Sequence, residues 1–383
     1  MSKPTMFLVS PMLHQGGFER VCITTARLMA DQFDIVIVIF DDRDIAYDVT
    51  GLQIINLKLG VQKGRLARFL NVKKRVDALK KLKEQYKPTV CYSFGPTANL
   101  VNAMSKNTTT KVWLGIRGFD DILYSNRLGY FSKKADLIVC CSKQMEQVIK
   151  EKYPAANTGM LYNLFDIDRM HREAEGEPEW PWPETDNLGR KFRVMISMGR
   201  DDEIKHFWHM IKAFKLVHDK IPEARLAILG DGTFEECKKL AIDLGIKDEV
   251  YFAGMRKDPY KYLKKAEIYL LTSRNEGFPN AIVEGMCFGL APISTDCLSG
   301  PREILEDGKY GILVPVMSLE ENYNPAELDE EAGLASEIVG LLQDEARLSH
   351  FKANAVERAK DFSYEAYHEN FMKIYNESVG TRH

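Results

Sequence analysis

The chain has 383 residues, of which 45% are hydrophobic and 28% charged, an ordinary composition for a soluble protein of two or three domains. A net charge of −3 gives no electrostatic reason to expect nucleic-acid binding. Seven cysteines without a C-x-x-C pair indicate buried free thiols in a reducing compartment. The N-terminal apolar run is too short for a signal peptide, and no run of about 18 apolar residues exists. We therefore predict a cytoplasmic location, in solution or peripheral at the inner face of the cell membrane.

Short runs rich in Val and Ile alternate with helical patterns in the first half of the chain. These runs are apolar on both faces, which is typical of a parallel sheet covered by helices. The predicted strands are 5–11, 33–40, 52–58, 89–94, 111–116 and 135–142, and the predicted helices are 18–31, 67–87 and 143–153.

The alternation stops at residues 172–191, which hold three prolines and much charge, so we predict an interdomain linker there. A second series then begins. Its predicted strands are 192–199, 224–231, 250–254, 267–273, 291–296 and 311–316, and a final helix is predicted at 362–379. The fold class is therefore α/β, with two doubly wound domains in tandem. In such sheets, ligands bind at the carboxyl ends of the strands, and the natural site is the cleft between the two domains.

The segment RNEGFPNAIVEGM, residues 274–286, directly follows the predicted strand 267–273. It holds a Gly-Phe-Pro-Asn turn between two glutamates, followed by apolar spacing that indicates a helix ending at Gly289. Pro279 and Asn280 suit the start of that helix. Backbone N–H groups at a helix start bind phosphate without needing a metal ion, and Gly277 allows the close backbone approach that this requires.

The two glutamates of this segment suit hydroxyl groups on either side of a phosphate. Glu276, before the turn, could accept hydrogen bonds from a sugar, and Glu284, one turn into the helix, could reach the vicinal hydroxyls of a ribose. A diphosphate between two hydroxyl-rich groups is a nucleotide sugar. The alternative is that Glu276 is a loop charge and Glu284 a solvated helix residue.

Residues 276–305 closely resemble the signature of the family-four retaining glycosyltransferases, which carry two glutamates separated by seven residues, as here. The resemblance covers nearly the whole chain and is strongest over 192–316; segment 294–305 looks most like enzymes that assemble capsule, O-antigen and teichoic-type polysaccharides. Further segments that match in register are 16–21, 161–168, 197–214, 224–232 and 250–254.

This resemblance implies the GT-B fold, in which two Rossmann-like domains face each other across the nucleotide-sugar site. It implies an acceptor domain over 1–171, a donor-nucleotide domain over 192–361, and a C-terminal helical segment, 362–383, that crosses back to the first domain. It also implies a retaining transfer from a UDP-hexose or UDP-N-acetylhexosamine, used as a substrate, with no cofactor and no metal.

The resemblance also implies a role for each matched residue. Arg200 and Lys205 hold the diphosphate and stabilise it as it leaves. Glu276 binds the donor sugar and Glu284 the ribose. The remaining implied contacts to the donor are made by Gly16, Gly17, Gly254, Met255, Gly277, Phe278, Pro279 and Asn280.

One position departs from the family pattern. Many relatives carry a histidine after the strand equivalent to 111–116, whereas this chain has Arg117. We expect Arg117 to contact the sugar or phosphate, or to serve the acceptor. His14 could assist near segment 16–21, which resembles the family's N-terminal glycine loop. His206 and His209 lie three apart, which indicates one face of a helix and not a metal site.

Residues 58–87 hold eleven Lys or Arg and two acids, a local balance of +9, with apolar residues at roughly helical spacing. One interpretation is an amphipathic helix packed on the sheet with a solvated basic face. The other is a contact with an anionic membrane that gathers a polyprenyl-diphosphate-linked acceptor. The apolar residues concerned are Leu66, Phe69, Leu70, Val76, Leu79 and Leu82.

Other functions remain open from the sequence. A non-catalytic protein that binds nucleotide sugars would keep Arg200 and Glu284 but show no turnover, and a glycosyltransferase could act on a soluble small-molecule or protein acceptor. A dinucleotide oxidoreductase would need G-x-G-x-x-G after its first strand, and neither 14–20 nor 230–235 has that pattern.

Overall fold

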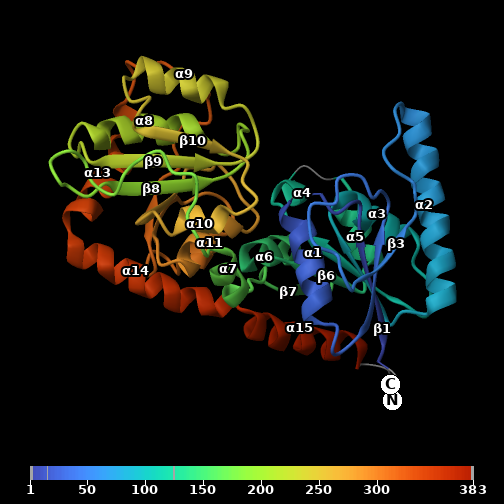
Figure 1. Cartoon of the computed structure of the whole chain (residues 1–383). Coiled ribbons are helices and arrows are strands. Elements are labelled where there is room, and N and C mark those ends of the chain that lie inside the picture. The colour runs from blue at the N-terminus through green and yellow to red at the C-terminus, as the bar shows by residue number, and fades with distance from the viewer. Residues whose placement is uncertain (1–2, 15, 124–125, 381–383) are drawn as a thin grey trace. The chain divides into compact units, whose positions relative to one another are not determined.

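The computed structural model of the protein describes residues 3–14, 16–123 and 126–380, which divide into two compact units. The first unit comprises Met1–Leu164 and Tyr364–His383, and the second comprises Phe165–Ser363 (Figure 1). The C-terminal helix α15 (Tyr364–Val379) thus belongs to the first unit although it follows the second in sequence. It packs there through Tyr367 and Phe371, and Ser378 accepts a 3.0 Å hydrogen bond from the indole of Trp113.

The first unit contains a seven-stranded parallel sheet in the order β3-β2-β1-β4-β5-β6-β7. All six predicted strands are confirmed, and a short, half-buried seventh strand was missed because it has only three residues. The strands are β1 (Thr5–Ser10), β2 (Asp34–Ile39), β3 (Gln53–Asn56), β4 (Val90–Phe94), β5 (Lys111–Ile116), β6 (Leu137–Cys140) and β7 (Thr158–Met160).

Helices cover both faces of this sheet, which is why its strands are apolar on both faces. One buried cluster joins the sheet to α1 and α15, and a second joins it to α2 and α3. The helices before Leu164 are α1 (Gly17–Leu28), α2 (Arg65–Tyr86), α3 (Pro96–Met104), α4 (Asp120–Leu123), α5 (Leu128–Lys134) and α6 (Lys143–Lys152).

The second unit contains a six-stranded parallel sheet in the order β10-β9-β8-β11-β12-β13, and every predicted strand is present. Its strands are β8 (Arg193–Met198), β9 (Ala224–Leu229), β10 (Val250–Gly254), β11 (Ile268–Leu271), β12 (Ala291–Thr295) and β13 (Ile312–Val314). Its α-helices are α7 (Ile167–Glu173), α8 (Phe207–His218), α9 (Glu235–Asp243), α10 (Pro259–Leu263), α11 (Asn280–Cys287), α12 (Pro301–Ile304), α13 (Ala332–Gln343) and α14 (Glu345–Ala359), and two 3-10 turns, Asp329–Glu331 and Lys360–Phe362, complete it.

The segment predicted as a linker, 172–191, lies within the second unit, whose boundary falls earlier, between Leu164 and Phe165. Two aromatic side chains hold the segment there. Trp180 packs against Tyr262 with ring centroids 6.0 Å apart, and Trp182 donates a 3.0 Å hydrogen bond to the carbonyl of Asp248. The prolines and charges suggested a free connection, but these indole contacts attach the segment to the second unit.

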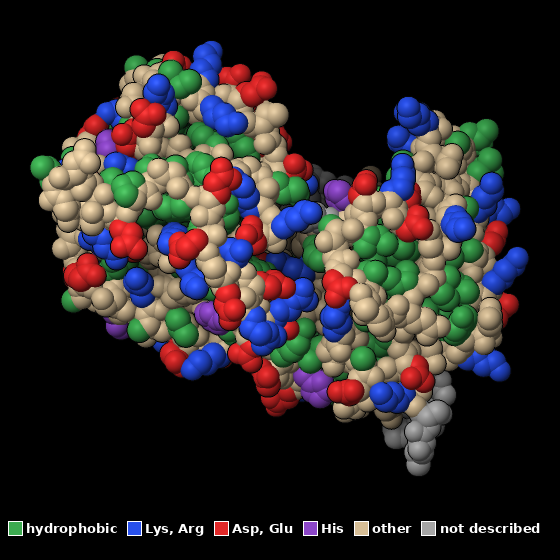
Figure 2. All heavy atoms as spheres, in the orientation of Figure 1, with side chains coloured by type: hydrophobic (Ala, Val, Ile, Leu, Met, Phe, Trp, Pro, Cys, Tyr) green, Lys and Arg blue, Asp and Glu red, His purple; other side chains and the backbone are tan. Residues whose placement is uncertain are grey.

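All seven cysteines are buried and free, as predicted. Among the described residues, no helix combines the length and hydropathy needed to cross a bilayer. Lys and Arg side chains and Asp and Glu side chains are mixed over the face of the second unit seen in Figure 2.

Candidate functional site

The second sheet has a topological switch point, because its first strand, β8, lies between β9 and β11. Chain segments that follow β8 and β11 leave the sheet in opposite directions there, so their residues meet at the carboxyl ends of the two strands. These segments contain Arg200 and Lys205 after β8, and 274–280 after β11. The sheet order alone therefore brings together two motifs that are far apart in the sequence.

An ion pair joins the two segments. Lys205 Nζ lies 2.7 Å from Glu276 Oε1, and Ser273 Oγ donates a 2.7 Å hydrogen bond to the same carboxylate oxygen. Only 19% of the Lys205 side chain and 13% of the Glu276 side chain is exposed, so solvent screens this pair weakly. Lys205, which is predicted to bind the diphosphate, and Glu276, which is predicted to bind the donor sugar, are thus in direct contact.

The turn after Glu276 is braced by the loop that follows β12. Glu276 N donates to the carbonyl of Leu298 at 3.0 Å, and Ser299 Oγ donates to the carbonyl of Gly277 at 2.9 Å. Gly300, with φ +99°, leaves no room for a side chain, because a Cβ there would lie 2.3 Å from Pro279 Cδ. This bracing role of 298–300 was not predicted from the sequence, although the segment carries part of the family resemblance.

The helix predicted after the turn is α11, which starts at Asn280 with Pro279 as its N-cap residue. It packs tightly on β11 because Gly285 faces Tyr269, where a Cβ would approach to 2.9 Å. Glu284 lies in the second turn of this helix and is only 5% exposed, so the alternative of a solvated residue is wrong. Burial raises the pKa of Tyr269, and the charges of Glu284 and Glu276 raise it further.

Glycines at the ends of β8, β9 and β10 keep the backbone compact on this edge of the sheet. Gly230, with φ +155°, lies so close to Gly199 that a Cβ would be 1.6 Å from the Gly199 carbonyl oxygen. Gly230 N in turn donates to the carbonyl of Gly254 at 3.0 Å. Gly254 has φ +69°, and the next residue, Met255, is exposed. Gly254 and Met255, which are implied donor contacts, therefore border the same edge of the sheet as Lys205.

Arg200, unlike Lys205, does not pair with Glu276. Its side chain is 75% exposed and lies 3.2 Å from Asp202. The next residue after Lys205, His206, has a left-handed backbone with φ +51°. Thr272 Oγ1 donates to the carbonyl of Lys205 at 2.9 Å and to the carbonyl of His206 at 3.1 Å. Thr272 and His206, which were not assigned to the site from the sequence, thus fix the backbone that carries Lys205.

In the first unit, Gly16 is the N-cap residue of α1 and Gly17 its first residue. Tyr47 clamps this point: its hydroxyl donates to the Gly16 carbonyl at 2.7 Å and accepts from the Gly16 N–H at 3.1 Å. The buried carboxylate of Glu19 fills the space beside Gly16, where a Cβ would lie 2.3 Å from Oε2. A side chain at position 16 would therefore have to displace the end of the Glu19 side chain, and Glu19 is not a surface charge.

Arg117 lies at the carboxyl end of β5 and is held by the first unit itself. Its Nη1 donates to Asn163 Oδ1 at 2.7 Å, its Nη2 donates to the Tyr92 hydroxyl, and its guanidinium carbon lies 5.5 Å from the ring centroid of Phe94. Asn163 and Tyr92 are both buried. His14, predicted to assist near the glycine loop, is exposed, with Nδ1 3.4 Å from the carbonyl of Asp44.

One group of residues in the described part of the chain has the spacing of possible metal ligands: His209, Glu330 and Glu331. Both ring nitrogens of His209 are already engaged, Nδ1 with Glu331 Oε1 at 2.6 Å and Nε2 with the carbonyl of Ser318 at 3.0 Å. His209 is buried on α8, as is His206 at its N-cap. These two contacts of His209 fasten the 318–331 region to α8.

Comparisons with known proteins agree with this architecture. A family model described as "Glycosyl transferases group 1" matches residues 179–331, all within the second unit. An uncharacterized glycosyltransferase of Methanocaldococcus jannaschii is 31% identical over 329 residues, which cover 76% of this chain and 80% of the relative.

A longer match is the N-acetylgalactosamine-N,N'-diacetylbacillosaminyl-diphospho-undecaprenol 4-alpha-N-acetylgalactosaminyltransferase of Campylobacter jejuni, 26% identical over 380 residues, or 94% of this chain and 96% of that one. The crystal structure of Anabaena HepE in complex with UDP has a TM-score of 0.76 at 18% identity and covers 97% of this chain and 100% of its own. The chain belongs to the group 1 glycosyltransferases, which act on nucleotide sugars, and its two Rossmann-like units are those of the GT-B fold.

Proposed function

We propose that the protein is a retaining hexosyltransferase that uses a UDP-hexose or UDP-N-acetylhexosamine, needs no metal ion, and builds a cell-surface polysaccharide on a lipid-linked acceptor. The observation that carries this proposal is the Lys205–Glu276 pair, 2.7 Å apart, at the switch point of the second sheet and next to the start of α11. One member has the charge to hold a diphosphate, and the other has the oxygens to hold sugar hydroxyls.

In this proposal, positive groups of the chain replace a metal ion. Lys205 and Arg200 face the negative charge that develops on the leaving diphosphate, and the N–H groups at the start of α11 add to it. The bond between the anomeric carbon and the phosphate oxygen breaks while the acceptor oxygen bonds on the same face of the sugar. The acceptor proton passes to the departing phosphate, so no side chain of this protein acts as a nucleophile.

When the donor binds, Lys205 and Glu276 each make a contact to it in addition to their contact with each other. Lys205 donates to the diphosphate, and Glu276 accepts from the sugar through the oxygen that does not bind Lys205. Glu284, preformed on a buried face of α11, accepts from both ribose hydroxyls. The turn 277–280, braced by Ser299 and Gly300, presents backbone N–H groups between the two glutamates. Arg200 is exposed and would leave Asp202 to reach the phosphate.

The acceptor assignment is supported by the Campylobacter relative, whose name specifies a diphospho-undecaprenol substrate. An acceptor with a polyprenyl chain is confined to a membrane, and the basic segment 58–87 would bring this protein to the anionic inner face of that membrane. We therefore assign the protein a peripheral location there.

The test is a panel of nucleotide sugars, each assayed for slow hydrolysis and for thermal stabilisation with excess chelator present. We expect one UDP-sugar to be hydrolysed and to raise the melting temperature, with unchanged rates in chelator. Stabilisation without hydrolysis or transfer would instead support a binding protein that lacks turnover. Loss of activity in chelator that a divalent ion restores would contradict the metal-free mechanism.

A further inference from the structure

The apolar side chains of α2 fall into two groups with opposite environments. Towards the C-terminal end, Val76 and Leu79 are buried in the cluster that joins α2 to the sheet. Towards the N-terminal end, Leu66, Phe69 and Leu70 are 73%, 67% and 47% exposed, and Val61 in the preceding loop is 65% exposed. We refer to Val61, Leu66, Phe69 and Leu70 as the α2 tip. Packing against the sheet therefore accounts for only part of the apolar residues of this helix.

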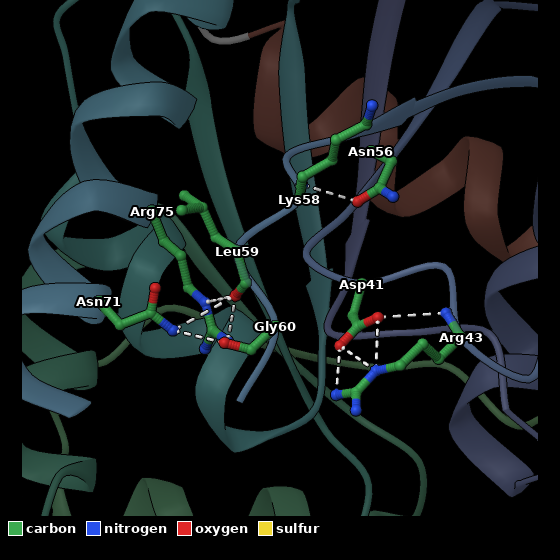
Figure 3. A network of polar contacts seen from close by, with 8 residues as sticks. All are labelled: Asp41, Arg43, Asn56, Lys58, Leu59, Gly60, Asn71 and Arg75. Carbon is green, nitrogen blue, oxygen red and sulfur yellow. Dashed lines mark hydrogen bonds and ion pairs between the residues drawn. The ribbon is translucent and has the colours of Figure 1, made fainter. Parts of the chain in front are cut away.

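The α2 tip belongs to a segment that is fastened to the sheet. Arg75 donates from Nε and Nη2 to the carbonyl of Leu59, at 2.8 and 2.5 Å, and Asn71 donates to the carbonyl of Gly60 at 2.7 Å (Figure 3). The Arg75 guanidinium also lies 4.6 Å from the ring centroid of Phe40.

The loop before α2 is fixed from its other side as well. Leu59 N donates to the carbonyl of Phe40 at 2.8 Å, and a Cβ at Gly60 would lie 2.1 Å from the carboxylate of Asp41. The Arg43 side chain, hydrogen-bonded to Asp41, lowers the pKa of that carboxyl and keeps it ionised (Figure 3). These contacts fix the loop before α2 and the helix that carries the α2 tip. The exposure of its apolar side chains therefore follows from the fold.

The charges around the tip have one sign. From 58 to 76 the chain has seven Lys or Arg and no Asp or Glu. Of the eleven basic residues in 58–87, Arg75 and Lys83 are buried, and the other nine are exposed together with only two acids, Asp77 and Glu84. Lys63, Arg65 and Arg68 alternate with the exposed apolar residues, and Figure 2 shows basic and hydrophobic side chains interspersed along α2.

This combination fits an anionic lipid surface better than a second copy of the chain. Apposed copies of the tip would bring like charges together without a compensating acid. At a bilayer, large apolar side chains enter the boundary between headgroups and acyl chains, while Lys and Arg extend their charged ends to the phosphates. We propose that the α2 tip inserts into an anionic bilayer and that the basic residues around it bind the lipid headgroups. The role of this membrane contact in the cell rests on the proposed function, in which the acceptor is lipid-linked. The insertion itself can be tested without any acceptor.

The experiment is co-sedimentation of the full chain with phosphatidylglycerol or phosphatidylcholine vesicles, at low and at physiological salt. We expect binding to phosphatidylglycerol only, weakened by salt. Leu66→Gln, Phe69→Gln and Leu70→Gln combined should lower the affinity at least tenfold, because the apolar contribution is lost. Lys63→Gln, Arg65→Gln and Arg68→Gln combined, which remove the basic residues around the tip, should abolish binding at physiological salt.

Matched controls lie in the second unit. Ile242→Gln removes an exposed apolar side chain, and the double variant Lys239→Gln with Lys247→Gln removes exposed charges, so both variants should bind vesicles like the wild type. A Phe69→Trp variant should shift its emission to the blue with phosphatidylglycerol vesicles and be quenched by brominated acyl chains.

The outcomes separate this inference from the proposed function. A wild type that ignores phosphatidylglycerol at low salt overturns the inference. So does a triple Gln variant that binds like the wild type, or a Phe69→Trp variant whose emission vesicles leave unchanged. Donor hydrolysis by the tip variants should equal that of the wild type. Vesicle binding with no hydrolysis of any nucleotide sugar would refute the enzymatic proposal and leave the lipid contact standing.

Discussion

The two units share one backbone plan but differ in what lies at the switch point. In each sheet the first strand lies between the second strand and the fourth, so each has a switch point: β1 with β4, and β8 with β11. The second unit places a cation and a carboxylate there, Lys205 and Glu276, in direct contact. The first unit places a glycine clamped by Tyr47 there, and its candidate cation, Arg117, is engaged by Asn163 and Tyr92.

The second unit thus has a pair of charged side chains at its switch point, whereas the corresponding residues of the first unit bind one another and hold the fold together. Topology supplies a ligand position in either sheet, but the side chains that follow the strands decide its chemistry. The family model matches only within the second unit. The donor chemistry in the proposed function therefore rests on side chains of the second unit.

The sharpest test of this division is Lys205→Ala, for which we expect turnover to fall about 100- to 1000-fold. The reason is the loss of a positive charge aimed at the leaving diphosphate. Steady-state kinetics of donor hydrolysis would measure it. Lys215→Ala is the matched control and should leave turnover unchanged, because Lys215 pairs with Asp219 at the C-terminal end of α8. A Lys205→Ala enzyme within about threefold of the wild type would remove the basis for placing the chemistry in the second unit.

The next test separates the two glutamates. Glu284→Gln should weaken UDP binding by roughly 1.5–3 kcal/mol, because a charged acceptor for the ribose is lost. Glu276→Gln should keep or strengthen UDP binding, since Lys205 loses its negative partner, while it lowers turnover through the donor sugar. Calorimetry with UDP and hydrolysis rates for both variants decide the matter. Equal losses of UDP affinity would contradict the division of roles.

The smallest effect is expected from the first unit. Arg117→Lys should lower turnover about tenfold at unchanged UDP affinity, because a lysine cannot reach Asn163 and Tyr92 at once in the same geometry. Arg43→Lys, an exposed arginine of the same unit, is the control. If Arg117→Lys only lowers the melting temperature, Arg117 is part of the scaffold. If it weakens UDP binding as much as Glu284→Gln, the comparison of the two units fails.

The fold was largely predictable because its signals are local. Apolar runs buried on both faces marked twelve of the strands, and helical spacing marked α1, α2, α6, α11 and α15. Helix α3 was not predicted, because five of its nine residues are buried, two of them asparagines, and it shows no charged face. Its Asn99 and Asn102 bind strand carbonyls inside the protein, at 2.8 Å each, although amide side chains usually indicate a surface.

By itself the sequence determined the parallel α/β class, the segments of the site and the start of α11, because strand pattern, turn chemistry and helix capping depend on neighbouring residues. Only the tertiary structure decided that Lys205 meets Glu276, that Ser299 and Gly300 brace the turn, and that Glu284 is buried. It also decided that α2 is packed at one end and exposed at the other, which its regular apolar spacing conceals. The reason is that burial and pairing depend on which distant segments the sheet order brings alongside, and no local pattern encodes that order.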